Sequence, residues 1–483
     1  MKLVFFSIVL WVISVQVSAV EKSVLQVTSF KQPPNFEAPW LRKKVRTANH
    51  LGVLVGPETV LVSASAVTYQ ALIEANFVGE SDTIPMIVAK VDYNVNLAIL
   101  KPKVKGTLSE VKAVELGDDL ALGESATLIS GRKGQGYLSI PIRMREVYIQ
   151  KVLTSSYAIA HYKFDVSQSS GLGWSEPIFK DGELVAISVG QDNDYVYGIP
   201  AKTIIKFLRD ATSKNYRGFT SIGVSVRSLK SPYIRSFLKV PDDVKSGVLI
   251  SDVFESSPFY NELKPFDVLI KVDGKLVNNT GYYDHPIWGK IHFIDLISGY
   301  SSGDTIKLTV IRNGLEMEVK AQGIVFDRLS RMIPDGRYSV DIPHLIFGGF
   351  IFQELDLGYL SMWGSRWRQD APDEMVFLSQ FKNFPHKSVD NKVVVLNRVL
   401  PHPHNKGYEW MNQIVLNKVN GYEVKSLGQL KDALTKRNTD HLDLALFEFS
   451  KGGGEAIISY KKIDGVHDTL AKEFNIPRRG SFF

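Results

Sequence analysis

Short β-branched segments interrupted by Gly, Pro and Asn dominate the chain from about residue 21 to residue 210. Many short strands with frequent turn signals predict an all-β barrel or sandwich. An amphipathic helix over residues 201–211 is expected to close this domain. The clearest strand-like segments are residues 52–55, 60–62, 97–100, 126–129 and 184–188.

One supersecondary pattern occurs twice in the rest of the chain. Residues 272–277, Val-Asp-Gly-Lys-Leu-Val, recur as residues 419–424, Val-Asn-Gly-Tyr-Glu-Val. Asp-Gly and Asn-Gly turns between alternating strands are typical of β-hairpins. We therefore expect two related units, the first beginning near Gly218, joined by an irregular aromatic-rich connection over residues 325–392. The helices predicted for the two units cover residues 290–297 and 427–434, and the matching strands cover residues 306–311 and 442–449.

Length and charge narrow the class of protein. The chain has 483 residues, of which 44% are hydrophobic, so about three domains are expected. The net charge of +6 comes from 57 Lys and Arg against 51 Asp and Glu, spread along the whole chain. Without a dense basic tract, the sequence does not predict a nucleic-acid partner.

The amino terminus has the pattern of an export signal. A positive residue, Lys2, is followed by an apolar run over residues 3–15 and by small residues at 17–19. The run is too short to span a bilayer, so residues 1–19 are predicted to be a cleaved signal peptide. The chain has no cysteine, which removes disulfides, thiolate metal sites and thiol nucleophiles and suits an oxidising compartment. We expect an exported protein of the periplasm or cell envelope, with no stable membrane insertion after cleavage.

The two C-terminal units resemble PDZ domains. Residues 247–277 follow the PDZ order of a Gly-Val strand, a Ser-Pro bend and a hairpin, although Phe266 stands where a glycine is usual. Together with the signal peptide and the β-rich domain, they resemble the layout of HtrA/Deg (Do-like) serine proteases. The segments 218–223, 344–352 and 416–424 are similar to the plant-type Deg branch.

The resemblance implies a mainly β fold. It consists of a trypsin-like double β-barrel, a PDZ domain and a C-terminal PDZ-like domain. The expected boundaries are residues 1–19 for the signal peptide, 20–212 for the degenerate protease domain, 215–325 for the PDZ domain and 326–483 for the PDZ-like domain.

The three catalytic positions of a trypsin-like protease are replaced in this sequence. The family's catalytic histidine ends a strand that matches residues 60–67, which puts Ser65 at that position. Its aspartate opens a strand that matches residues 96–101, which puts Asn96 there. The nucleophile loop places Trp174 at the serine position when aligned on Pro177. A serine cannot accept a proton near neutral pH, an amide cannot stabilise an imidazolium, and an indole cannot attack a carbonyl.

Two alternatives to this degenerate triad stay open. Alignment of the nucleophile loop on Gly171 puts Gly173 at the serine position instead, and neither register has a nucleophile. Ser169 or Ser170 could act as a shifted nucleophile, with His50 or His161 as its base. We expect no catalytic residues, and both histidines are more typical of strand or surface positions.

A peptide groove in the first PDZ-like unit is the main candidate binding site, and the alternative is that this fold is retained for assembly alone with its groove closed. No comparable carboxylate loop is evident in the second PDZ-like unit, for which assembly is the leading interpretation. The resemblance implies that the loop of Ser221, Ile222, Gly223 and Val224 offers backbone N–H groups to a peptide carboxylate. The peptide would then add as a strand beside a helix around Ile291 and Ile294. No metal or other cofactor is predicted, because His402 and His404 lie in a Pro-rich loop without a carboxylate or thiolate nearby.

Three functions are compatible with these features. The first is a catalytically inactive pseudoprotease that binds exposed or unfolded polypeptide in protein quality control, as a chaperone or adaptor. The second is an active serine endopeptidase with a non-standard site, and the third is a regulatory subunit of an active Deg protease. The resemblance also implies a trimer-based homo-oligomer.

Overall fold

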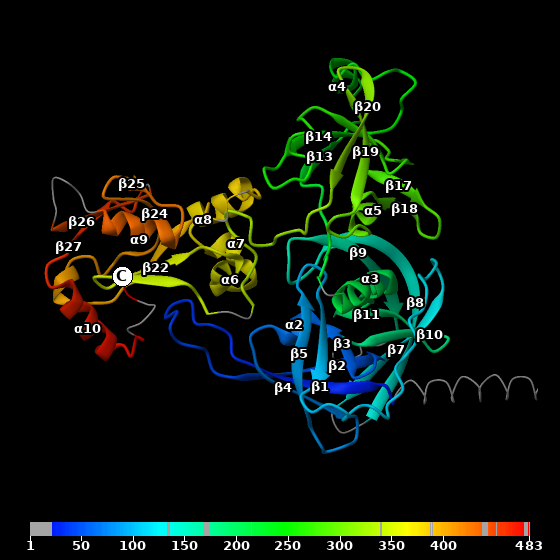
Figure 1. Ribbon diagram of the computed structural model, residues 1–483, viewed down its shortest axis with the longest axis horizontal. Coiled ribbons are helices and arrows are strands. Elements are labelled where there is room, and N and C mark those ends of the chain that lie inside the picture. The colour runs from blue at the N-terminus through cyan, green and yellow to red at the C-terminus, as the bar shows by residue number, and fades with distance from the viewer. Residues whose placement is uncertain are drawn as a thin grey trace, which may run out of the picture. The chain divides into compact units, whose positions relative to one another are not determined.

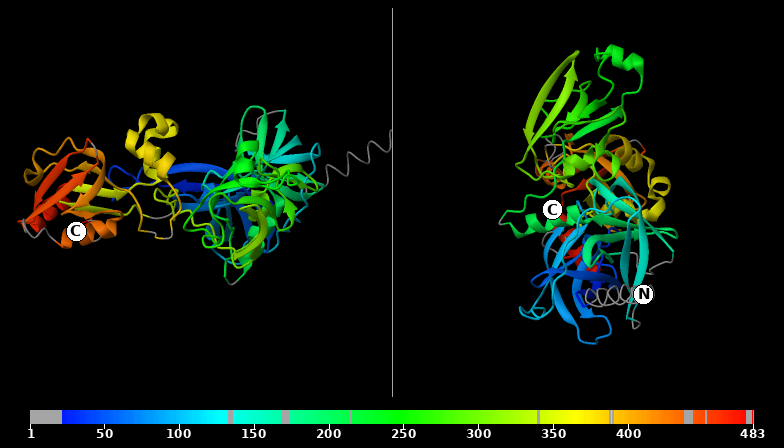
Figure 2. Two further views of the ribbon diagram at one scale, coloured as in Figure 1. Left: turned by 90° about the horizontal axis from the view of Figure 1, so that it is seen from above. Right: turned by 90° about the vertical axis from the view of Figure 1, so that its right-hand side faces the viewer.

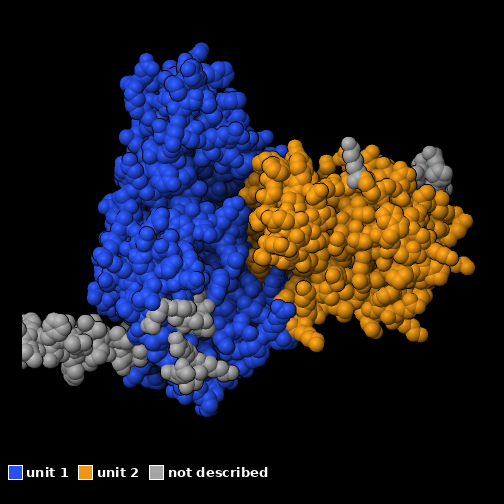
Figure 3. Space-filling view, turned by 180° about the vertical axis from the view of Figure 1, so that it is seen from behind, with its two compact units in different colours: residues 1–31, 45–326 blue, residues 32–44, 327–483 orange. Residues whose placement is uncertain are grey.

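The structure is a computed structural model in two compact units, which Figure 3 colours separately. One unit holds Val45–Phe326 together with the chain up to Lys31, and the other holds Gln32–Lys44 and Asp327–Phe483. The predicted signal peptide and the residues Ser169 and Ser170 lie outside the described residues. The structure describes residues 22–132, 136–167, 174–213, 215–338, 341–386, 388, 390–436, 443–450, 452–477 and 482.

The first barrel is closed by six antiparallel strands in the order β1-β2-β3-β6-β5-β4. Alternating apolar residues of these strands fill its interior, and a short helix, α2 (Ala64–Val67), follows β3. The strands are β1 Val24–Lys31, β2 Arg46–Gly56, β3 Thr59–Ser63, β4 Gln70–Phe77, β5 Ile84–Asp92 and β6 Leu97–Pro102.

The second barrel has the same closed form, in the order β10-β11-β12-β9-β8-β7 (Figure 1). An apolar cluster that includes Leu97 and Ile187 joins the two barrels, and Ile204 and Phe207 of α3 pack on it. Burial of each such side chain contributes about 1.5–3 kcal/mol. The elements are β7 Ser125–Arg132, β8 Gly136–Lys151, β9 Ala158–Val166, β10 Pro177–Lys180, β11 Glu183–Gln191, β12 Tyr195–Pro200 and α3 Ala201–Thr212.

The first PDZ-like unit belongs to the same compact unit as the barrels. Its sheet has the order β13-β14-β15-β19-β20, with β16 paired to β15. Phe266, at the position of the expected glycine, has a φ of +76°, a backbone region that glycine favours. The elements are β13 Val224–Ser228, α4 Pro232–Phe237, β14 Val248–Val253, β15 Val268–Val272, β16 Lys275–Leu276, β17 Tyr282–His285, β18 Gly289–His292, α5 Ile294–Ser298, β19 Thr305–Arg312 and β20 Leu315–Gln322.

The second unit repeats this sheet with one more strand, in the order β21-β22-β23-β24-β26-β27. Short helices between β22 and β23 form a separate yellow lobe in Figures 1 and 2. Its strands are β21 His344–Phe347, β22 Phe350–Glu354, β23 Val394–Val399, β24 Asn412–Val419, β25 Tyr422–Glu423, β26 Leu444–Phe449 and β27 Glu455–Ser459. Its helices are α6 Leu357–Leu360, η1 Ser361–Arg366, α7 Trp367–Asp370, α8 Asp373–Phe377, η2 Leu378–Lys382, η3 Pro403–Asn405, α9 Leu427–Thr435 and α10 Ile463–Glu473.

The predicted fold class is confirmed, since two closed barrels precede two related sheets of PDZ type. The predicted helix over residues 290–297 is wrong in its first half, because residues 290–292 belong to β18 and the helix begins at Ile294. Residues 32–44, expected in the protease-like domain, pack with the second unit. Within the described ranges, no helix has the length and apolar character needed to cross a membrane.

Candidate functional site

Ser65 and Asn96, at the predicted histidine and aspartate positions, lie side by side in the first barrel. Ser65 belongs to α2, and Asn96 immediately precedes β6. The Oδ1 of Asn96 accepts a hydrogen bond of 2.9 Å from the N–H of Ser65, and its carbonyl oxygen accepts one of 2.9 Å from Ala64. Its Nδ2 is buried and has no hydrogen-bond partner in the described part of the chain. The amide thus supports the turn through neutral hydrogen bonds and carries no charge for an imidazolium.

Trp174, at the predicted serine position, precedes a loop that is tied to both barrels. The Oγ of Ser175 accepts a hydrogen bond of 2.9 Å from the N–H of Ser63 in β3. The N–H of Ser175 donates to Ser188 O at 2.8 Å, and the N–H of the fully buried Glu176 donates to Ser188 Oγ at 2.9 Å. Ser175 has a φ of +62°, which glycine adopts more readily. The loop therefore has a backbone suited to glycine but uses its serine hydroxyl as a structural acceptor.

Asn96 and Trp174 line one cavity of about 650 Å³. Strands β8, β9, β11 and β12 supply most of its wall, and many of the side chains are polar. None of the described residues that line it is serine, threonine or cysteine. The lining residues are Asn96, Glu146, Tyr148, Gln150, Lys151, Val152, Leu153, His161, Lys163, Trp174, Val189, Gly190, Gln191 and Tyr197.

Three titratable groups in the cavity, His161, Tyr148 and Tyr197, are poorly suited to base catalysis. Burial lowers the pKa of His161 to about 4, and its Nδ1 lies 3.1 Å from Ile159 O. Burial raises the pKa of Tyr148, whose ring stacks on His161 with centroids 5.9 Å apart. A hydrogen bond to Asp192 raises the pKa of Tyr197 to about 12. Near neutral pH these three side chains are uncharged, and a base with a pKa of about 4 activates a hydroxyl poorly.

His50, the other candidate base, is buried in β2. Burial and the positive charge of Lys31 lower its pKa to about 3, and neither ring nitrogen has a hydrogen-bond partner among the described residues. The Nζ of Lys31 lies 2.5 Å from Ser65 O, and burial lowers the pKa of Lys31 to about 8. Sequence reasoning missed this lysine beside α2. Ser169, Ser170 and Gly173 lie outside the described residues.

The predicted carboxylate loop of the first PDZ-like unit is held by its own side chains. Ser221 Oγ accepts a hydrogen bond of 3.1 Å from Gly223 N, and Ser257 Oγ donates one of 2.6 Å to Ile222 O. Gly223 has a φ of +60°, and a Cβ there would lie 2.7 Å from Ser257 Cα, so only glycine fits. The N–H of Ile222 has no hydrogen-bond partner among the described residues. The loop is therefore ordered and retains a donor for a ligand.

Strand β13, which begins at Val224, is the edge of its sheet. It pairs with β14 on one side, and no described strand pairs with its other side. Val224 and Val226 of β13 pack on the same apolar cluster as Ile294 at the start of α5. The strand and the start of the helix thus pack on one core, and the peptide groove between them stays a prediction.

Ile291, also predicted to line the groove, does not pack on this cluster. It lies in β18, is 1% exposed and packs in the core of the second barrel. The prediction assumed that the helix would extend over Ile291, but the alternating residues 289–292 pair with β17 instead.

The β17–β18 hairpin docks the PDZ-like sheet on the second barrel, a feature that sequence reasoning missed. Trp288 Nε1 donates a hydrogen bond of 3.0 Å to Leu120 O, and the indole is 4% exposed. Lys202 of α3 forms an ion pair of 2.7 Å with the buried Asp295 of α5, which also accepts a 2.7 Å hydrogen bond from Tyr283. The sequence feature that could have predicted this hairpin is the aromatic-rich insertion over residues 281–293, which has no counterpart between β25 and α9 of the second unit.

The chain is similar to known proteins over most of its length. PDZ domain families match residues 220–322 and 333–482. In Arabidopsis thaliana, protease Do-like 2, chloroplastic, is 22% identical over 95% of this chain and 74% of its own length. Protease Do-like 4, mitochondrial, of the same organism is 22% identical over 88% of this chain and 79% of its own. The structure of HtrA-type protease AlgW with tripeptide has a TM-score of 0.50 at 16% identity, covering 65% of this chain and 96% of that chain.

Two closed barrels followed by two PDZ domains define a protein with a protease-type fold and PDZ modules. The chain carries two PDZ domains, and over most of its length it is similar to HtrA/Do-like proteases.

Proposed function

We propose that this chain is a catalytically inactive HtrA/Do-like protein that binds exposed or unfolded polypeptide. It would act as a chaperone or adaptor in the cell envelope. The two clearest catalytic positions carry Ser65 and Asn96, whose contacts are structural hydrogen bonds. The described wall of the adjacent cavity lacks an aliphatic hydroxyl or a thiol that could serve as a nucleophile. Export and a trimer-based oligomer belong to the same proposal, and the C-terminal motifs support the plant-type branch of the family.

The observation that carries the proposal is the open edge of β13 beside the carboxylate loop. An extended peptide that adds to a sheet edge gains main-chain hydrogen bonds, and adjacent pockets give it side-chain specificity. Here the N–H of the loop residue Ile222 has no hydrogen-bond partner among the residues that the structure describes, and Val226 and Ile294 provide apolar surface on the strand and the helix. A backbone-directed mode of this kind is suited to many unfolded clients.

A matched pair of variants tests the proposal. Val226→Glu places a charge on the groove side of β13, whereas Arg227→Glu places the same residue at an exposed position of the same strand. With a labelled hydrophobic peptide that has uncharged side chains and a free carboxylate, we expect at least tenfold weaker binding for V226E. R227E should change the affinity less than about threefold, and amidation of the peptide should weaken binding to the unaltered chain.

Casein separates binding from proteolysis. The full chain is expected to leave casein intact and to suppress its aggregation. Cleavage that disappears in the Ser169→Ala or Ser170→Ala variant would instead establish an active endopeptidase. Binding that is unaffected by V226E would exclude the β13 groove as the site. Co-purification with an active Do-like protease, with no peptide binding by this chain alone, would favour the regulatory function.

A further inference from the structure

The second PDZ domain has a strand where the first has an open edge. Its strands β22-β23-β24-β26-β27 follow the same order as β13-β14-β15-β19-β20, and α9 follows β25 as α5 follows the β16–β18 segment. By this order, β22 corresponds to β13. Strand β21 pairs with the outer edge of β22, the edge to which a peptide would add in the first domain.

The pairing of β21 with β22 has the geometry of an added peptide. The two strands are antiparallel, with Leu345 opposite Phe352 and Phe347 opposite Phe350. The chain direction leads β21 toward the tight turn at Gly348, at the start of β22. A PDZ ligand likewise runs toward the loop that precedes the strand to which it adds.

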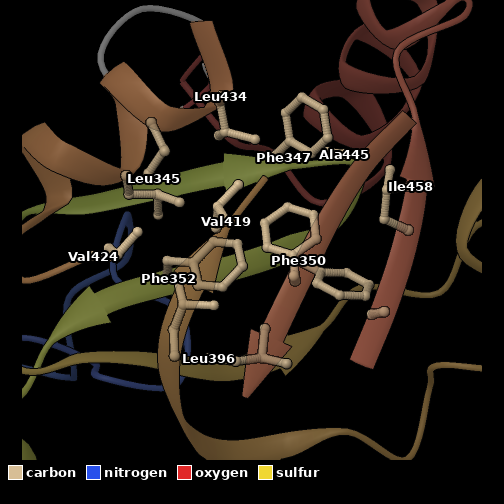
Figure 4. Close-up of a cluster of buried hydrophobic side chains, with 14 of the residues drawn as sticks. Leu345, Phe347, Phe350, Phe352, Leu396, Val419, Val424, Leu434, Ala445 and Ile458 are labelled. Atoms are coloured by element: carbon tan, nitrogen blue, oxygen red, sulfur yellow. The ribbon is translucent and has the colours of Figure 1, made fainter. Parts of the chain in front are cut away.

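Side chains of β21 fill the space beside α9. Leu345 and Phe347 belong to the same core cluster as Leu430 and Leu434 of α9, and they are 8% and 0% exposed. Figure 4 shows Leu345 and Phe347 on the side of the strand where Leu434 lies. Ile346 points the other way, into a cluster with Val466 and Leu470 of α10. The α9 side of the groove is thus occupied by an apolar-x-aromatic sequence.

The turn that follows β21 is closed to a carboxylate. The N–H of Gly348 donates a hydrogen bond of 3.0 Å to Nε2 of His467, whereas in the first domain the N–H of Ile222 is free of such a contact among the described residues. Asn405 Nδ2 donates to Gly348 O at 2.7 Å. A Cβ on Gly349 would lie 2.2 Å from that Nδ2, so the side chain of Asn405 fills the turn.

We propose that β21 is the resident ligand of the second PDZ domain. The groove between β22 and α9 is a peptide site for strands of Leu-x-Phe type, and the chain closes it with its own residues Leu345 and Phe347. The second domain is then unable to take a client while β21 is in place. This inference does not depend on the peptide-binding function proposed for β13.

A peptide supplied in trans tests the proposal in the full chain. The probe is a labelled, amidated hexapeptide with the sequence of residues 342–347, and V226E is present throughout to weaken binding at β13. The double substitution Leu345→Ala and Phe347→Ala removes the two side chains that fill the space beside α9. This double variant should bind the probe at least tenfold more tightly than the parent chain, which carries V226E alone. The control Ile346→Ala empties only the α10 side and should resemble the parent. The proposal would be overturned if the parent bound the probe tightly. It would also be overturned if the double variant were folded but did not bind the probe more tightly than the parent.

An engineered disulfide provides a second test, which leaves Leu345 and Phe347 in place. Ile346 and Ile351 are opposite each other across β21 and β22, a placement compatible with a bridge, and the chain has no native cysteine. Oxidised I346C/I351C should lose both thiols through a bond within one chain. A bridge between two chains would show that β21 is exchanged between copies, and two persistent thiols would contradict the pairing. Either result would refute a resident strand.

Discussion

The two PDZ domains of this chain share one strand order but differ at one sheet edge, which is uncovered among the described residues of the first domain and covered by a strand in the second. In the first, no described strand covers the outer edge of β13, which lies beside a loop whose Ile222 N–H has no hydrogen-bond partner in the described part of the chain. In the second, β21 covers the corresponding edge, and Gly348 N is bonded to His467. A single additional strand therefore decides whether a PDZ fold can take a peptide by strand addition or serves as a closed module.

The domains also differ in how they are supported. The first rests on the second barrel through Trp288 and through the ion pair between Lys202 and Asp295. The second has its own two-sided core, with α9 on one face of β21 and α10 on the other. The first PDZ domain thus depends on the packing of the second barrel. If the chain is catalytically inactive, as proposed, this dependence gives a physical reason for it to retain both barrels.

The largest effect is expected from Phe347→Ala in β21. Because Phe347 is fully buried, the substitution should lower the free energy of unfolding of the second unit by about 3–5 kcal/mol. Denaturant unfolding with hydrogen exchange by mass spectrometry assigns the loss to a unit. A loss below about 1 kcal/mol would mean that β21 is a dispensable edge, and the contrast between the domains would fail.

Removal of the indole from the docking hairpin should have the next largest effect. Trp288→Ala loses a buried ring and its hydrogen bond to Leu120, so we expect the first unit to lose about 3 kcal/mol. Faster hydrogen exchange in β17, β18 and α5 measures the undocking. Tyr282→Ala, at an exposed position of the same hairpin, is the control. Equal effects of both substitutions would argue against a docking function for Trp288.

Acid should weaken the support of the first PDZ domain. The folded-state pKa of His161 is lowered from 6.5 to about 4 by burial, so the unfolded state binds more protons between these values. The stabilisation is complete above pH 6.5 and is lost as the pH falls toward 4, on the order of 2–3 kcal/mol at pH 4. His161→Gln should flatten this dependence in urea unfolding. An unchanged slope would place the acid sensitivity elsewhere.

The smallest effect is expected at the carboxylate loop. Ser257→Ala removes two buried hydrogen bonds, one that the hydroxyl donates to Ile222 O and one that it accepts from the N–H of Phe259, and should cost about 1–2 kcal/mol in stability. It should also weaken binding of the free-carboxylate peptide about threefold, because the loop loses part of its order. Ser251→Ala, in the neighbouring strand β14, serves as the control, with little change in affinity. Tighter binding by S257A would contradict a preorganised loop.

Much of the fold could be predicted because it depends on local patterns. The helices at 201–211 and 427–434 and the strand at 60–62 show clear periodicity, and each is present in the structure. The helix predicted over residues 290–297 was wrong at its start because a tertiary contact decides the local structure there. Ile291 packs in the core of the second barrel, and its segment forms a strand.

The site could be predicted only where two short motifs define it. Ser65 and Asn96 were aligned from adjacent strand ends, and the structure brings them into hydrogen-bond contact. The cavity beside them could not be predicted, because its wall comes from four strands, with His161 and Tyr197 far apart in sequence. The residues of β21 were recognised as part of a sequence motif. The pairing of β21 with β22 could not be predicted, because it depends on the tight turn at Gly348 that joins the two strands.

The stoichiometry of peptide binding tests the central claim most directly. Titration of the full chain with the free-carboxylate peptide, with mass analysis of the peptide afterwards, should give one site per chain and an intact peptide. That site should be lost in V226E. Two sites per chain would contradict the closed groove of the second PDZ domain, and a cleaved peptide or no binding would contradict a non-catalytic peptide binder.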